Sequence, residues 1–452
     1  MVFHYPRKRG DAQSMPKEVL VIGGGIAGIQ ASLDLANRGI KVHLVEELPS
    51  IGGRMAQLDK TFPTLDCSIC ILAPKMIECF RHPNINLLTY SKVTEVQGSV
   101  GNFTVKILKK PRYVDVEKCT GCSTCMEKCP AKVPSEFDMG LGTRKAIYMS
   151  FKQAVPLIAT IDHDHCLYFT KGICQVCKKL CPSNAINFEQ KPEEIALNVS
   201  SIIVATGFDV FDPSVMSEYG YSRYKNVLHS MEFERLICAS GPTGGHLLRP
   251  SDGEPPKSVA FIQCVGSRSQ AGDVPYCSSV CCVYATKESI LIKGYAPNTE
   301  VSILYIDLRA VGKGFQEFVD KAKKEYGVNY IKAHPGEITE DPTTKNLQIH
   351  YEDISSGEMK KLAADMIVLC PPLIPKGSNK EIADVMGLEL DDYGFFKPSN
   401  ELTAPIDTSV PGIYICGFCQ SPKDIPESVA QASGAAARAA EATKRFVKEA
   451  NS

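Results

Sequence analysis

The chain has 452 residues, enough for about three domains of ordinary size. Its formal net charge is −1 and no apolar run approaches the ~18 residues of a membrane helix, so nucleic-acid binding and membrane insertion have no support. The first residues are basic and lack the apolar core of a signal peptide, which indicates a cytoplasmic protein. Nineteen cysteines in such a chain favour metal ligation over a disulfide framework, and suggest an anaerobic cytoplasm.

After a flexible tail over residues 1–16, the chain is expected to form a βαβ unit. Its strand, helix and second strand are expected over residues 18–22, 29–37 and 41–45. The turn between the first two has the spacing G-x-G-x-x-G with Gly23, Gly25 and Gly28, and Glu46 ends the second strand. The first glycine permits the tight turn, the second lets backbone approach a pyrophosphate, and the third lets the helix pack on the strand. The pattern therefore predicts a dinucleotide site with Glu46 on the ribose.

Later motifs indicate which dinucleotide is bound. A glycine pair with Arg54 follows the unit, a strand over residues 202–205 runs into Thr206 and Gly207, and a strand over residues 412–416 precedes a small-residue helix over 428–445. Together these features resemble flavoproteins of the thioredoxin-reductase-like class. The resemblance implies FAD, held further by Gly52, Gly53, Arg54, Gln57, Ala205, Thr206, Gly207 and Gly417. Phe418 and Cys419 stand where this class usually has an aspartate on the flavin's ribityl chain.

Two cysteine sets, each ending in Cys-Pro, interrupt the flavoprotein pattern. The first has the spacing C-x2-C-x2-C-x3-C-P, whose fourth cysteine crosses to the other cluster in two-cluster ferredoxins. One [4Fe–4S] cluster is then expected on Cys119, Cys122, Cys125 and Cys181. The other is expected on Cys166, Cys174, Cys177 and Cys129, with seven residues between its first two cysteines. The alternatives are a structural zinc site or disulfides.

In the thioredoxin-reductase-like class, a later strand runs into a second glycine turn, which binds a nicotinamide dinucleotide. The equivalent strand here, over residues 258–262, runs into a cysteine motif instead. The motif has the spacing C-x12-C-x3-C-C and consists of Cys264, Cys277, Cys281 and Cys282. Loss of glycines and gain of cysteines at one place predicts a third, non-standard [4Fe–4S] cluster. The alternative is a group of buried thiols without metal.

Taken together, these motifs resemble those of the A subunit of heterodisulfide reductase, over nearly the whole chain from about Lys17 onward. The resemblance rests on the glycine turn, the segments 51–60 and 66–70, Cys119 to Cys122, Ala205 to Gly207 and the non-standard cysteine set. It implies flavin-based electron bifurcation or confurcation, with Lys287 contacting the flavin N5. Long members of the family carry extra cluster domains that are not among the domains expected here. Partner redox subunits are therefore expected to supply electron entry and exit. A homodimer is a further possibility.

The expected fold is α/β, a two-dinucleotide-binding-domain flavoprotein with an inserted ferredoxin domain. The segments are residues 17–110, 193–250 and 376–452 for the FAD domain, 111–192 for the ferredoxin and 251–375 for the degenerate nicotinamide-type domain. The enzyme class is an oxidoreductase. Other functions left open are a non-bifurcating flavin relay of a quinone-interacting membrane oxidoreductase-like complex, an NAD(P)H-dependent flavoprotein and a scaffold with a dead cofactor site.

Seven cysteines lie outside these motifs. Cys67, Cys70 and Cys79 follow the second glycine pair, and packing or a flavin-adjacent role is preferred for them over a further cluster or a redox pair. Core positions are expected for Cys238, Cys370, Cys416 and Cys419.

Overall fold

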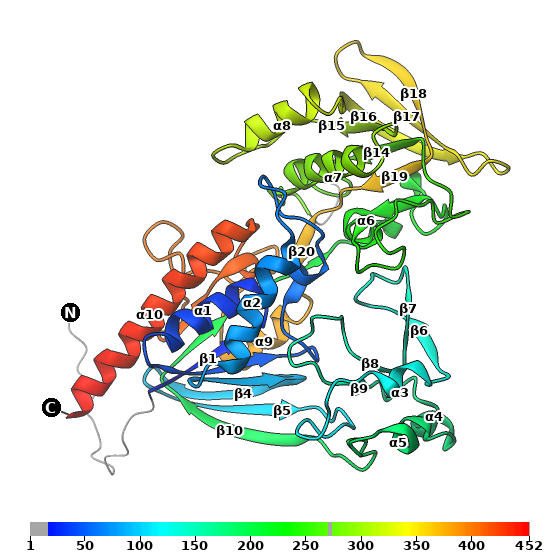
Figure 1. Ribbon diagram of the computed structural model, residues 1–452. Helices are drawn as coiled ribbons and strands as arrows, with labels where there is room; N and C mark the ends of the chain where they lie inside the picture. The colour runs from blue at the N-terminus through cyan, green and yellow to red at the C-terminus, as the bar shows by residue number, and fades with distance from the viewer. Residues whose placement is uncertain (1–16, 270–273, 452) are drawn as a thin grey trace.

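The computed structural model describes residues 17–269 and 274–451 of the chain. Figure 1 shows a lower part that holds the first and last described elements and the inserted cysteine-rich segment, and an upper part drawn in green to yellow. Among the described residues, no helix is both long and apolar enough to cross a bilayer.

The lower part is built around a parallel sheet of five strands in the order β21-β11-β1-β2-β3. The strands are β1 (Glu18–Ile22), β2 (Lys41–Glu46), β3 (Ile85–Thr89), β11 (Ser201–Val204) and β21 (Ile413–Ile415). Their near-continuous apolar sequences are typical of strands buried on both faces. Val19, Leu20 and Val21 are accordingly all fully buried.

Different elements cover the two faces of this sheet. Helices α1 (Ile26–Ala36), α2 (Ser68–Arg81) and α10 (Ile425–Asn451) share one hydrophobic core with one face. On the other face lie helix α9 (Asn379–Met386) and an antiparallel sheet in the order β10-β5-β4, whose strands are β4 (Ser91–Ser99), β5 (Asn102–Lys109) and β10 (Glu193–Val199).

Two helices are longer at their starts than the sequence pattern predicts. Helix α1 begins at Ile26 instead of residue 29, so Gly28 lies inside its first turn. Helix α10 begins at Ile425 because Asp424 and Glu427 exchange reciprocal side-chain-to-backbone hydrogen bonds of 2.8 and 2.9 Å, a capping box. Buried alanines along α10 let it lie close against α1, as Figure 1 shows.

The cysteine-rich segment is inserted between two adjacent strand ends. Lys109 at the end of β5 pairs with Glu193 at the start of β10, so the insert leaves and re-enters the sheet at one point. It contains short elements only, namely α3 (Thr124–Glu127), α4 (Leu167–Lys171), α5 (Val176–Leu180), β6 (Lys132–Pro134), β7 (Thr143–Lys145), β8 (Ile147–Tyr148) and β9 (Thr160–Ile161). Its small core places cysteines among apolar side chains such as Val114 and Ile186.

The upper part holds a seven-stranded sheet in the order β13-β19-β14-β15-β16-β17-β18. The strands are β13 (Val227–His229), β14 (Ser258–Ile262), β15 (Glu300–Tyr305), β16 (Asn329–Glu340), β17 (Leu347–Asp353), β18 (Glu358–Ala364) and β19 (Met366–Leu369). The first five strands in the sheet order, from β13 to β16, are parallel to one another, and β16, β17 and β18 form an antiparallel meander. Helices α6 (Ser230–Ile237), α7 (Cys281–Tyr295) and α8 (Phe315–Lys324) contribute to one core with this sheet.

The two parts are joined by a two-stranded link. Strand β12 (Phe208–Val210) leads up and pairs antiparallel with β20 (Leu373–Pro375), which leads back. Strand β13 already belongs to the upper sheet, although it lies in the 193–250 segment assigned from sequence to the FAD domain. The remaining short helical turns are η1 (Gly53–Gln57), η2 (Pro213–Val215), η3 (Ser217–Tyr219) and η4 (Gly417–Cys419).

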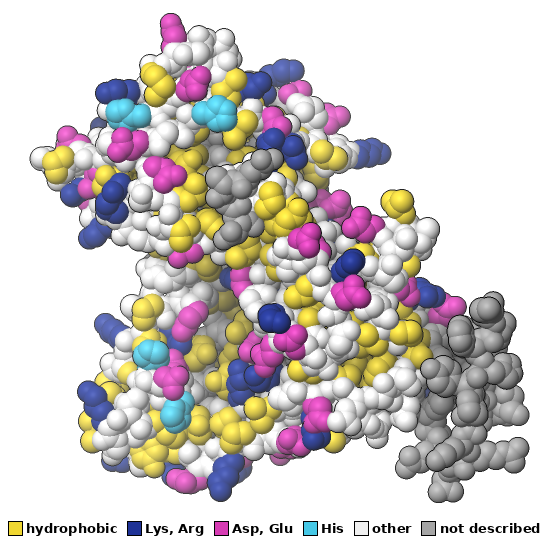
Figure 2. Space-filling view, turned by 180° about the vertical axis from the view of Figure 1, so that it is seen from behind, with side chains coloured by type: hydrophobic (Ala, Val, Ile, Leu, Met, Phe, Trp, Pro, Cys, Tyr) yellow, Lys and Arg dark blue, Asp and Glu magenta, His cyan; other side chains and the backbone are white. Residues whose placement is uncertain are grey.

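Figure 2 shows the opposite side of the molecule. Positive and negative side chains are interspersed over both parts of this face. The surface is hollowed between the upper part and the insert, and the cavity described below is lined by residues of both.

Candidate functional site

A cavity of about 980 Å³ lies at the carboxyl ends of the central parallel strands, between the lower part, the insert and the upper part. In open α/β sheets, ligands bind at this end of the strands. The cavity gathers most of the residues predicted to bind the cofactor, together with the predicted catalytic lysine. These are Gly23, Gly25, Glu46, Gly53, Arg54, Gln57, Ala205, Thr206, Gly207 and Lys287. Gly28, Gly52 and Gly417 lie outside its lining.

The glycines of the first turn have different surroundings. A Cβ atom on Gly23 would lie 2.3 Å from the carbonyl oxygen of Ala205, and one on Gly28 would lie 1.8 Å from that of Gly23. Gly25, the N-cap of α1, has no atom of the described residues within 4 Å of its would-be Cβ, and none of their side chains caps the helix there. The free N–H groups of a helix N-terminus bind anions well. The open space at Gly25 therefore fits a pyrophosphate.

Glu46 is buried at the end of β2, and its carboxylate helps to shape the turn. One oxygen accepts a hydrogen bond of 2.7 Å from the Gly24 N–H, and the other accepts one of 2.8 Å from the Leu48 N–H. Burial raises the pKa of this carboxyl group. Each oxygen keeps a second lone pair, so the predicted ribose contact remains chemically open.

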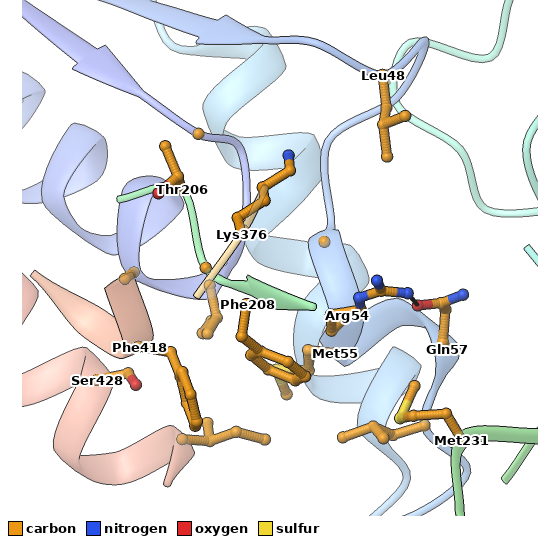
Figure 3. Close-up of a pocket in the computed structure, with 18 of the residues that line it drawn as sticks. Leu48, Arg54, Met55, Gln57, Thr206, Phe208, Met231, Lys376, Phe418 and Ser428 are labelled. Carbon is orange, nitrogen blue, oxygen red and sulfur yellow. Dashed lines mark hydrogen bonds between the residues drawn. The ribbon is translucent and has the colours of Figure 1, made fainter. Parts of the chain in front are cut away.

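A polar network in the wall of the cavity joins three segments, namely η1, strand β12 and the insert. Arg54 donates a hydrogen bond of 3.1 Å to Gln57 (Figure 3) and another of 3.1 Å to Asp209. Gln57 in turn donates a hydrogen bond of 2.9 Å to the Phe137 carbonyl of the insert. Gln57 is therefore also a contact between the predicted flavin site and the predicted ferredoxin.

An apolar part of the wall adjoins this network, and the Arg54 guanidinium lies over the Phe208 ring. The rings of Phe208 and Phe418 lie 4.6 Å apart between centroids, as Figure 3 shows. Phe418 occupies the position at which the thioredoxin-reductase-like class usually has an aspartate. The buried Cys419 follows it, so this wall offers a flat aromatic surface in place of a charged side chain.

Lys287 reaches the far end of the cavity from α7 and is buried, unlike an ordinary helix-surface lysine. Its Nζ forms an ion pair with Glu234 of α6 and donates a hydrogen bond of 3.3 Å to the Lys60 carbonyl. The other Glu234 oxygen accepts a hydrogen bond of 3.0 Å from the Asp59 N–H. Burial lowers the pKa of Lys287 to about 8. Sequence reasoning missed Glu234, although a buried lysine calls for an acidic partner.

The structure brings together the cysteines predicted for the first ferredoxin cluster. A small cavity of about 20 Å³ in the insert is lined by Cys119, Cys122, Cys125 and Cys181. Cys181 comes from the end of α5, more than fifty residues after the others, so the predicted crossing of the fourth cysteine is present in the fold.

Three cysteines of the second predicted set, Cys129, Cys166 and Cys177, lie near one another. Burial raises the pKa of Cys177 to about 12, and like charge on the neighbouring Cys166 and Cys129 acts in the same direction. The seven residues after Cys166 contain the short helix α4, which returns the chain toward Cys174. Cys174 is exposed and has a positive φ of 86°. The unusual spacing is thus accommodated by one helical turn.

The non-standard set gathers at the start of α7. Burial raises the pKa of Cys281, and the thiols of Cys282, Cys264 and Cys277 add like charge around it. Arg268 lies beside the Cys264 sulfur and forms an ion pair with Asp307. Across the described part of the chain, no three His, Cys, Asp or Glu side chains converge closely enough for a single metal ion. The thiolates of a four-iron cube bind different irons and lie farther apart than the ligands of one ion.

Three cysteines of uncertain role separate into a pair and a core residue. Cys67 and Cys70 form a disulfide at the start of α2, beside the cavity-lining residues Asp66 and Ile71. The expectation of packing as free thiols is therefore wrong for this pair, whereas the flavin-adjacent role stays a prediction. Cys79 is buried beneath α1, where its thiol donates a hydrogen bond of 3.7 Å to Ile29. The cysteines expected in the core are all buried: Cys238, Cys370, Cys416 and Cys419.

Comparison with known proteins identifies the two cofactor-binding segments. A family described as "FAD dependent oxidoreductase" matches residues 18–64, and one described as "4Fe-4S binding domain" matches residues 112–135. The chain is 54% identical over 420 residues to the iron–sulfur A subunit of the "CoB--CoM heterodisulfide reductase" of Methanocaldococcus jannaschii. The chain is similar to the A subunit of heterodisulfide reductase over 93% of its own length. The predicted resemblance is confirmed.

Other relatives agree. The chain is 52% identical over 427 residues to the A subunit of the "H(2):CoB-CoM heterodisulfide,ferredoxin reductase" of Methanothermobacter marburgensis. It is 50% identical over 424 residues to the A subunit of the "H(2)/formate:CoB-CoM heterodisulfide,ferredoxin reductase" of Methanococcus maripaludis. These matches cover 93–94% of the chain but only 63–64% of the length of the three relatives.

Solved structures confirm the predicted fold class. The thioredoxin reductase of Lactococcus lactis matches with a TM-score of 0.52 and 16% identity, over 96% of this chain and 99% of the other. The thioredoxin reductase of T. acidophilum matches with a TM-score of 0.52 and 17% identity, over 94% and 98%. At this identity the likeness concerns the fold, to which the chain adds the ferredoxin insert.

Proposed function

We propose that this chain is the FAD and iron–sulfur electron-transfer subunit of a heterodisulfide-reductase-like complex, and that it performs flavin-based electron bifurcation or confurcation. One observation carries the proposal: a single cavity is bordered by two different cysteine-bearing segments. The insert contributes Phe137 and Tyr148 to its lining, and α7, which starts at the non-standard cysteine set, contributes Lys287. A flavin held there has cluster sites on two sides, as a branch point requires.

The proposed division of labour follows the geometry. The turn at Gly25 and Glu46 would hold the adenosine diphosphate half of FAD, and the Lys287 end would hold the redox-active ring. FAD supplies the ability to accept electrons in pairs and to release them singly. Lys287 places a buried cation at this end, which favours negative charge arriving on the ring. Glu234 holds that cation in position.

The cluster ligands proposed are the three cysteine sets expected from spacing. They are Cys119, Cys122, Cys125 and Cys181 for one ferredoxin cluster, Cys166, Cys174, Cys177 and Cys129 for the other, and Cys264, Cys277, Cys281 and Cys282 for the third. Because β12 and β20 form the link between the two parts, we place the end of the second FAD-domain segment near residue 212, ahead of β13. The complex would supply partner subunits that carry electrons to and from these clusters.

The two one-electron potentials of the flavin test bifurcation against simple relay. Holoprotein purified anaerobically would be titrated at equilibrium while flavin and cluster signals are followed separately. The proposal predicts crossed potentials, with the second electron accepted more readily than the first. Potentials in the ordinary order would contradict bifurcation and favour the relay. Rapid bleaching of the flavin by NAD(P)H alone would instead indicate an NAD(P)H-dependent flavoprotein.

A further inference from the structure

Among the described residues that line the cavity, one carboxyl group has no hydrogen-bond partner. Glu288 follows Lys287 on α7, lines the same cavity and is fully buried. Neither of its carboxyl oxygens has a hydrogen-bond partner in the part of the protein that the structure describes. Leaving a buried polar group unpaired costs about 1–3 kcal/mol. Such a group at the wall of a binding cavity is explained if its partner is the molecule bound there.

The position of Glu288 on the helix separates it from the cysteine site. Tyr284, Lys287 and Glu288 are spaced i, i+3 and i+4, so they share one face of α7, and all three line the cavity. Cys281 precedes Glu288 by seven residues, which is roughly 10 Å along the helix axis. The carboxyl group therefore belongs to the ring end of the proposed flavin site.

The surroundings of Glu288 keep it neutral near pH 7. Burial raises its pKa to about 8, against the opposing influence of the Lys287 cation. The other ionisable groups facing it are the hydroxyl of Tyr284 and the thiol of Cys370 from the end of β19, both with pKa values raised by burial. Lys287 is engaged by Glu234, so it does not neutralise a Glu288 carboxylate by direct contact. An apolar site can keep a carboxylic acid protonated, able to donate a hydrogen bond.

We propose that Glu288 is a redox-linked proton site, whose carboxyl group faces the flavin ring and, at pH values where it is ionised in the oxidised protein, binds a proton when electrons arrive there. The inference rests on the proposed function. Two electrons come from a reduced iron–sulfur donor, and bulk water supplies one proton, which forms an O–H bond on the Glu288 carboxylate. When the electrons leave to an acceptor, that bond breaks and the proton returns to water. The physical cause is that arriving negative charge increases the proton affinity of a neighbouring acid.

The test compares the pH dependence of the flavin potential in wild type, Glu288→Gln and a control. Above about pH 8, where Glu288 is ionised before reduction, wild type takes up one more proton per two electrons than Glu288→Gln. Its reduction constant therefore falls by an additional tenfold per pH unit, about 30 mV for a two-electron couple. Below that pH the two slopes coincide. Lys287 is present in both proteins, but its charge interacts with that of Glu288, so its own titration shifts between them. The infrared measurement on labelled glutamate separates the two groups.

Glu232→Gln is the matched control. Glu232 is also buried and has a pKa raised to about 7, but it is hydrogen-bonded to His229 and Tyr221 and lies outside the cavity lining. This variant should keep the wild-type slope. Equal slopes for wild type and Glu288→Gln would overturn the inference, as would an effect confined to the cluster potentials.

A second measurement on the wild-type protein covers the case in which Glu288→Gln does not fold. Redox-difference infrared spectroscopy at about pH 9 with carboxyl-labelled glutamate should show a protonated carboxyl band gained on reduction. A spectrum without such a band would contradict the inference. FAD content is measured in the same samples, so loss of the flavin itself, which would count against the proposed function, is distinguished from an uncoupled Glu288.

Discussion

Gly25 and Gly28 differ by three positions, yet the structure gives them separate tasks. Gly28 lies where α1 crosses the backbone of the turn, so any side chain there meets the Gly23 carbonyl. Gly25 has ordinary backbone dihedrals and open space in front of it. The same substitution should therefore affect folding at one position and ligand binding at the other.

We expect Gly28→Ala to destabilise the protein by about 3 kcal/mol, because the added methyl group overpacks the turn. Gly25→Ala should change the stability of the apoprotein by about 1 kcal/mol or less, the cost of a poorer N-cap. It should also weaken FAD binding by about tenfold or more, which is about 1.4 kcal/mol. Urea unfolding of the apoproteins and titration with FAD measure the two effects. Unchanged FAD affinity in Gly25→Ala would place the pyrophosphate elsewhere.

At this scale the glycine spacing predicted the turn correctly, since each glycine answers a local backbone requirement. The lysine was found through family resemblance. Its partner Glu234 and its neighbour Glu288 were not found, because both are ordinary helix residues until tertiary contacts bury them. α7 is buried on nearly all sides, and its sequence lacks the polar face that would have marked it as exposed.

Short elements decide how the cysteines converge. The second ferredoxin set departs from the standard spacing, and α4 takes up the additional residues between Cys166 and Cys174. The sequence predicted the ligand sets through spacing alone, whereas the length of the loop could not show that it folds back. Likewise, β13 joins the upper sheet through long-range pairing with β19, which local sequence does not reveal.

Replacing Cys166 by serine tests the second ferredoxin set. We expect Cys166→Ser to lose one cluster, so that iron falls by about four per chain, with FAD retained. Cys238→Ser is the control, because Cys238 is buried at the end of α6 outside every cysteine set and should leave iron unchanged. Iron and FAD are measured on the same anaerobic preparations. Wild-type iron in Cys166→Ser would remove this residue from the ligand set.

At the scale of the whole molecule, three parts of the chain meet at one cavity. The lower part provides the dinucleotide turn, the upper part provides the buried lysine, and the insert closes the third side through Phe137 and its neighbours. Because β5 and β10 pair at the point of insertion, the insert is anchored at both ends beside the flavin-binding sheet. This arrangement explains how a ferredoxin can be built into a flavoprotein without disturbing its central strands.

The fold class could be predicted from sequence because its landmarks are local motifs at the ends of strands. The shape of the cavity could not, since it depends on how the two parts are set against each other by the β12 and β20 link. The aromatic wall formed by Phe208 and Phe418 is one result of that arrangement.

Iron and FAD per chain, measured on protein purified without oxygen, test the central claim most directly, namely that one chain joins a flavin to two separate cluster-bearing segments. The account predicts one FAD and about twelve irons, from three clusters of roughly four irons each. About eight irons would contradict a cluster on the Cys264 set and with it the second side of the branch, and absence of FAD would contradict the account as a whole.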